Sequence, residues 1–248
     1  MIQEFVVFYV LSAVFCSLLP NEDLLGKQFG LAVHNISRKY FLQDKPVVIQ
    51  TTDSFICSYK SNDKVHHEQK LFELLSKDYQ LITFGCKDKE DVNNNYKIKA
   101  GSAVIMLPQV DIHTQIKQSF HIVFSIIDTI GDLLKNVVLL SSYVSKTKSE
   151  QEQVALALLN KQWKSSYLSE VIVLLPEIGW SFNSRNKLPE LEVFTWFVEK
   201  QRVPCLRYVQ EVTLIDRWIS QENGFRNNSD LFPLKKITDL HGCILKVS

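Results

Sequence analysis

Glycine is scarce in this chain, and so is an excess of charge of either sign. The 248 residues include only 8 glycines, about half the usual share, so the glycine-rich loops that cradle phosphate groups are not expected. The formal net charge is +1, and no long basic or acidic run occurs. Because nothing supplies a strong electrostatic field, the sequence predicts no binding to nucleic acid and none to an anionic membrane surface.

Recognisable metal and catalytic patterns are missing too. No two cysteines have the CxxC spacing of a zinc site, and the histidines lack metal-ligand spacing. The adjacent His66 and His67 would point about 100° apart on a helix. Ser181, in "GWSFN", lacks the small neighbours and the following helix of a nucleophile elbow. We therefore predict no enzyme activity, no metal site and no cofactor.

What the sequence does have is an apolar amino terminus, "MIQEFVVFYVLSAVFCSLLP". The stretch from Phe5 to Leu19 is too short to span a bilayer but suits the core of a secretory signal. Residues 1–17 are therefore predicted to be a signal peptide, which implies the secretory pathway. The residues before this stretch include Glu4 and no Lys or Arg, so a buried strand or helix stays the alternative.

Cysteine arithmetic agrees with secretion. Removal of the leader removes Cys16 and leaves an even number of cysteines, with three possible pairings. The four that remain are Cys57, Cys86, Cys205 and Cys243. The simplest pairing joins the first to the second and the third to the fourth, because each bridge then closes a local loop; four buried free thiols are the alternative. Sequons at Asn35 ("NIS") and Asn227 ("NNS") are predicted glycosylation sites.

Helix and strand patterns alternate along the rest of the chain. Apolar residues recur at helical spacing over 24–40, "HEQKLFELLSKD" predicts a second helix, and Ser149 with Glu152 predicts a capping box ahead of a third. Strands are predicted at "PVVIQTT", "YQLITFGC", "KIKAGSAVIML", "SFHIVFSIID", "NVVLLSS", "EVIVLLPE" and "LEVFTWF". The alternation of strand and helix is typical of an α/β fold with a largely parallel sheet. The aromatic residues Phe194, Trp196 and Phe197 are expected in its core.

The second half of the chain carries a resemblance to a known family. "VFTWFVEKQRVPC" at 193–205, "LIDRWI" at 214–219 and "GFRNNSDLFPLKKITDLHGCILKVS" at 224–248 follow one another in an order that resembles insect ionotropic receptors, chemosensory relatives of the ionotropic glutamate receptors. The likeness covers about residues 130–248 and is weaker over 20–130. Cys205 and Cys243 fall on cysteine positions of the family, which favours their pairing. The chain departs from the family at Leu234, where an asparagine is frequent.

The resemblance implies a fold, a set of domains and a function. The fold would be a reduced periplasmic-binding-protein-like sandwich with a largely parallel sheet, similar to the amino-terminal domain of such receptors. Residues 18–230 would be the extracellular amino-terminal region, and residues 231–248 a linker and the first strand of a truncated ligand-binding domain. The ligand-gripping residues and the pore of a cation channel would lie beyond Ser248.

The expected function is therefore receptor assembly and chemical detection at the extracellular side of the cell membrane. The expected partners are co-receptor subunits of the same family and a small-molecule ligand bound by domains absent from this chain. A soluble secreted binding protein, with its ligand in a cleft between sheets, is the alternative. A secreted enzyme ranks third.

Overall fold

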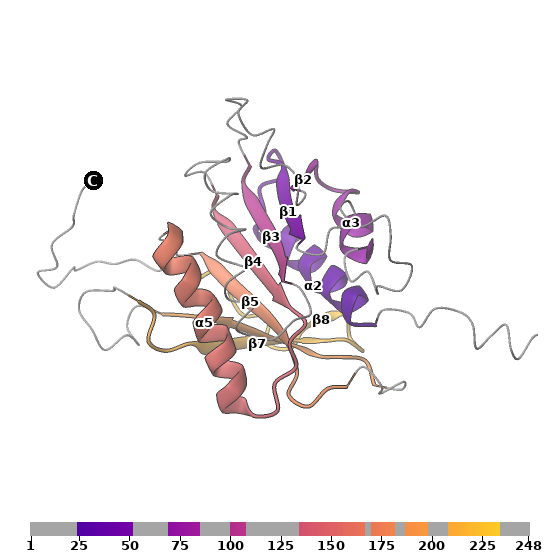
Figure 1. Cartoon of the computed structure of the whole chain (residues 1–248). Helices are drawn as coiled ribbons and strands as arrows, with labels where there is room; N and C mark the ends of the chain where they lie inside the picture. Colours follow the sequence, from indigo (N-terminus) through magenta and orange to yellow (C-terminus); the bar gives the residue numbers. More distant parts are fainter. Residues whose placement is uncertain are drawn as a thin grey trace, which may run out of the picture.

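The described part of the chain is an α/β structure in which one mixed sheet has helices on both faces (Figure 1). The computed structural model describes residues 24–51, 69–84, 100–107, 134–166, 170–181, 187–197 and 208–233. The helices within these residues are α2 (Leu24–Tyr40), α3 (Gln69–Leu75) and α5 (Lys148–Ser166). The strands are β1 (Val47–Thr51), β2 (Leu81–Phe84), β3 (Ser102–Leu107), β4 (Asn136–Ser141), β5 (Val171–Pro176), β6 (Leu191–Thr195), β7 (Thr213–Ile219) and β8 (Gly224–Phe225).

The eight strands lie in the order β2-β1-β3-β4-β5-β6-β7-β8. Neighbours from β2 to β5 are parallel, whereas β6, β7 and β8 are added by antiparallel pairing. The predicted α/β class and the mostly parallel sheet are thus confirmed. The predicted strand "SFHIVFSIID", at 119–128, lies outside the described residues.

The core has two halves because side chains alternate between the faces of the sheet. In β3, Val104 and Met106 belong to the half that α2 and α3 cover, and Ala103, Ile105 and Leu107 belong to the half that α5 covers. Strands β3, β4 and β5 are buried along their whole length. Their continuous apolar sequences reflect this position, since parallel strands with helices on both faces meet no solvent.

The aromatic residues in and after β6 largely follow the sequence-based expectation. Phe194 and Trp196 are 2% and 1% exposed and lie in the half of the core beneath α5. Phe197 is only partly buried. The opposite half contains Trp218 of β7, which is 1% exposed. Antiparallel β6 and β7 therefore contribute large side chains to both halves of the core.

The predicted capping box of the third helix was wrong by two residues. The amide of Glu150 donates a hydrogen bond to the Thr147 hydroxyl at 3.2 Å, and the Glu150 carboxylate accepts one from the Lys146 amide at 2.7 Å. Thr147 and Glu150 thus cap α5 in place of Ser149 and Glu152. Both pairs have the spacing Ser/Thr-x-x-Glu, so spacing alone does not separate them.

Candidate functional site: the strap against helix α2

Of the side chains that the sequence singles out as modification sites, the structure describes two. Asn35 is exposed on α2, and Asn227 is exposed just after β8. Exposure at both sequons is what attached glycans require. The cysteines Cys57, Cys86, Cys205 and Cys243 lie outside the described residues, and their pairing stays a prediction.

After β8 the chain runs back to α2, and we call residues 227–233 the strap. A carboxylate of β7 holds its first half. Asp216 is 1% exposed; its Oδ1 accepts hydrogen bonds from the amides of Arg217 and Asn227 at 2.8 and 3.0 Å, and its Oδ2 accepts one from the amide of Ser229 at 2.8 Å. A buried charge needs such partners. Asn228, between two of them, has a left-handed φ of 48°.

The last residues of α2 hold the second half of the strap. The Tyr40 hydroxyl donates to the carbonyl of Ser229 at 3.3 Å and accepts a hydrogen bond from the amide of Leu231 at 3.0 Å. Lys39 Nζ donates to Asn228 Oδ1 at 3.1 Å. Tyr40 is itself fixed, because its carbonyl accepts a hydrogen bond from the Asn136 side chain at 2.8 Å. One tyrosine hydroxyl therefore pairs with two nearby backbone groups of the strap.

Apolar burial completes the attachment. Leu231 and Phe232 are 2% and 7% exposed and belong to the half of the core that α2 covers. The rings of Phe232 and Tyr40 meet edge to face, with centroids 5.1 Å apart. The described part of the predicted linker, residues 231–233, thus packs on the sheet domain.

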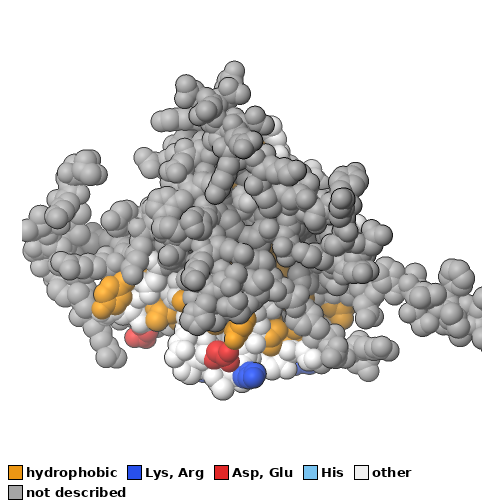
Figure 2. Space-filling model, in the orientation of Figure 1, with side chains coloured by type: hydrophobic (Ala, Val, Ile, Leu, Met, Phe, Trp, Pro, Cys, Tyr) orange, Lys and Arg blue, Asp and Glu red, His pale blue; other side chains and the backbone are white. Residues whose placement is uncertain are grey.

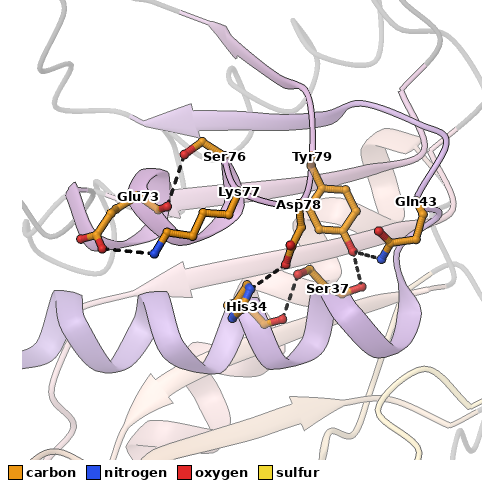
Figure 3. A network of polar contacts seen from close by, with 8 residues as sticks. All are labelled: His34, Ser37, Gln43, Glu73, Ser76, Lys77, Asp78 and Tyr79. Carbon is orange, nitrogen blue, oxygen red and sulfur yellow. Dashed lines mark hydrogen bonds and ion pairs between the residues drawn. The ribbon is translucent and has the colours of Figure 1, made fainter.

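Helix α2 is held on its other side by a polar network (Figure 3). His34 pairs with Asp78 at 2.8 Å. The Tyr79 hydroxyl donates to the carbonyl of Ser37 at 2.8 Å and accepts a hydrogen bond from the Gln43 amide at 2.8 Å. Burial raises the pKa of Tyr79, so its hydroxyl keeps its proton. Contacts on two sides of α2 therefore hold its carboxyl half, and with it Tyr40, in position.

The strand order indicates a second candidate site, a ligand-binding site at the carboxyl edge of the parallel strands. In the order β2-β1-β3-β4-β5 the connections reverse direction between β1 and β3, and open α/β sheets bind ligands outside the carboxyl ends of strands at such a switch point. Gln50, near the end of β1, is 6% exposed. The segments immediately after β1 and β3 lie outside the described residues.

The described stretches contain no other recognisable site. Within them, no cluster of three or more His, Cys, Asp or Glu side chains could hold a metal ion, and no helix is long and apolar enough to cross a membrane. Ser181 is exposed, and the residues 182–186 that follow it lie outside the described residues. On the side shown in Figure 2, the described surface mixes polar and apolar side chains with scattered single charges.

An ion pair between β6 and β7 joins the buried carboxyl group of Glu192 to Arg217, whose side chain is 41% exposed. Glu192 and Arg217 are opposite each other in the register of the two strands, and Arg217 Nη2 lies 2.6 Å from Glu192 Oε1. Burial raises the pKa of Glu192, although Arg217 and Gln151 act in the opposite direction and Glu177 adds to the increase. Folding therefore favours the protonated form of this carboxyl group relative to the unfolded chain.

This shift predicts a dependence of stability on pH. Between the ordinary carboxyl pKa and the raised one, the folded chain keeps a proton that the unfolded chain has released, so the free energy of unfolding falls as pH rises through that window. We expect Glu192→Gln to remove this fall. Urea denaturation of the wild type and the variant, at several pH values between about 4 and about 7, measures how the free energy of unfolding changes with pH. A variant that keeps the wild-type slope would contradict the assignment.

Comparison with known proteins identified no relative: no family model, no curated protein and no solved structure matches the chain. Its function therefore has to be inferred from its own residues and their geometry.

Proposed function

We propose that this chain is the extracellular amino-terminal region of a ligand-gated cation channel of the ionotropic chemosensory receptor type. Its task is receptor assembly with co-receptor subunits and support of the domains that detect a small-molecule ligand. On this proposal residues 1–17 are a signal peptide, residues 18–230 the extracellular region, and residues 231–248 lead into the ligand-binding domain. The chain itself is not an enzyme.

The strap is the observation that carries the proposal. The stretches that resemble the receptor family, 193–205, 214–219 and 224–248, include most of β6 and β7 and all of β8 and the strap. In this part of the chain Asp216 and Tyr40 fix the path of the backbone against the sheet and α2. A domain that positions a following domain requires a defined exit for the chain, and these contacts supply it.

The strand order supports the finer fold assignment within the same proposal. Five parallel strands in the order β2-β1-β3-β4-β5 have the doubly wound arrangement, which suits one lobe of a periplasmic-binding-protein-like domain. The exposed sequons at Asn35 and Asn227 suit a secretory route. We also propose the disulfides Cys57–Cys86 and Cys205–Cys243.

A soluble secreted binding protein is the second candidate. The switch point between β1 and β3 favours it, because a small ligand could bind at the carboxyl edge near Gln50. The described strands form one sheet, so among them no cleft between two sheets exists. This candidate therefore needs its ligand at the sheet edge.

The transcript beyond the codon for Ser248 separates the two. We expect the reading frame to continue into a second α/β lobe interrupted by three apolar spans of about 20 residues each. Sequencing of mature message from the source tissue measures this. A stop codon directly after Ser248 would refute the receptor proposal and leave the soluble binding protein.

A further inference from the structure

The strap differs from the rest of the sheet region in how its backbone is held. Within the part of the chain that the structure describes, every hydrogen bond to the backbone of residues 227–233 has a side chain as its partner. The amides of Asn227 and Ser229 bind Asp216, the carbonyl of Ser229 and the amide of Leu231 bind Tyr40, and the amide of Phe232 binds Asp230 at 3.2 Å. Among the described strands, no ladder includes the strap.

The backbone ladder stops just before the strap. Strand β8 pairs with β7 through only two residues, and the amide of Arg226 donates to the carbonyl of Arg217 at 2.9 Å. Segments without ladder hydrogen bonds open at lower free energy than the strands of the core. The side chains of Asp216 and Tyr40 therefore hold the strap's backbone in place of a ladder, and the buried side chains of Leu231 and Phe232 add to its attachment.

We propose that the strap is a releasable latch, closed in this structure, that sets the length of chain between the sheet and the residues beyond 233. Its opening removes the contacts of Asp216 and Tyr40 with the strap and withdraws Leu231 and Phe232 from the core. The seven residues 227–233 then act as additional tether, up to about 23–25 Å long when extended. A following domain would gain the difference between that length and the distance that the closed strap already spans.

Helix α2 is placed to control the latch. Tyr40 is its last residue and Lys39 its penultimate one, and both contact the strap. A shift of the carboxyl end of α2 moves the Tyr40 hydroxyl away from Ser229 and Leu231 together. The latch thus converts a small displacement of α2 into release of the exit chain. This role rests on the proposed function, in which another domain comes after this one.

Amide hydrogen exchange of the purified full chain, read by mass spectrometry, tests the latch. Tyr40→Phe keeps the ring against Phe232 and removes the hydroxyl. We expect exchange at residues 227–233 to become about 5- to 30-fold faster, the effect of losing one or two hydrogen bonds. Exchange in β4 and β5 should not change, because the sheet stays folded.

Tyr79→Phe is the matched control. Its hydroxyl also donates to a carbonyl of α2 and accepts one hydrogen bond, but it does not contact the strap. Exchange at 227–233 should accelerate much less in this variant than in Tyr40→Phe, because Tyr79 acts on the strap only through the position of α2. An unchanged strap in Tyr40→Phe, or an equal acceleration in β4 and β5, would overturn the proposal. The exchange rates are independent of any sequence beyond Ser248, so failure of the latch and failure of the receptor proposal are distinguishable.

Discussion

Replacing Asp216 by alanine should lower the free energy of unfolding by about 2–4 kcal/mol. The carboxylate is buried and accepts hydrogen bonds from three backbone amides. Alanine leaves those amides without acceptors, and unpaired buried amides cost about 1–3 kcal/mol each when water cannot replace the lost partner. The free energy with which the strap docks limits the loss, because an undocked strap exposes its amides to water.

Equilibrium urea denaturation, followed by circular dichroism, measures this loss, and Asp230→Ala is the matched control. Asp230 is exposed and accepts one amide hydrogen bond, from Phe232, so its loss should cost about 0.5–1 kcal/mol. Asp216→Asn keeps the shape and one acceptor oxygen, and we expect an intermediate loss. If the two alanine variants were equally stable, Asp216 would not be the centre of the strap's attachment.

The interior strands could be predicted from the sequence because a strand that is buried on both faces is apolar at nearly every position. "SAVIML", "NVVLLS" and "VIVLLP" are buried throughout, and no polar position interrupts them except at their ends. The parallel pairing of the last two followed from the helix predicted between them. Helix starts were less certain, since Thr147–Glu150 and Ser149–Glu152 present the same spacing.

The attachment of the strap could not be predicted in the same way. An aspartate inside "LIDRWI" is the visible signal, because Asp216 shares its face of β7 with the buried Trp218 and must therefore have partners. Those partners are backbone amides at 227 and 229, which have no sequence signature. In the sequence, Tyr40 looks like an ordinary residue at the end of an amphipathic helix. Its contact with the strap, about 190 residues further along the chain, becomes visible only in the structure.

The largest decrease in the free energy of unfolding should come from a substitution at the core contact between β7 and α2. Trp218 is 1% exposed, its Nε1 donates to Gln28 Oε1 at 2.9 Å, and its ring meets that of Phe225 edge to face with centroids 5.2 Å apart. We expect Trp218→Ala to cost about 3–5 kcal/mol, because it removes a large buried ring and leaves a cavity. Circular dichroism in urea is the suitable measurement, since removal of a tryptophan alters fluorescence directly.

The polar part of that contact can be separated from the packing. Trp218→Phe keeps an aromatic ring but leaves Gln28, which is 2% exposed, without its donor, and we expect a loss of about 1–3 kcal/mol beyond the change in volume. Adding Gln28→Leu removes the unpaired oxygen and should recover part of this loss. Tyr208→Ala, at a side chain 48% exposed, should stay within about 0.5 kcal/mol of wild type. Strictly additive losses in the double variant would show that the Trp218–Gln28 hydrogen bond does not couple β7 to α2, and only the packing of the indole ring would then join the strand to the helix.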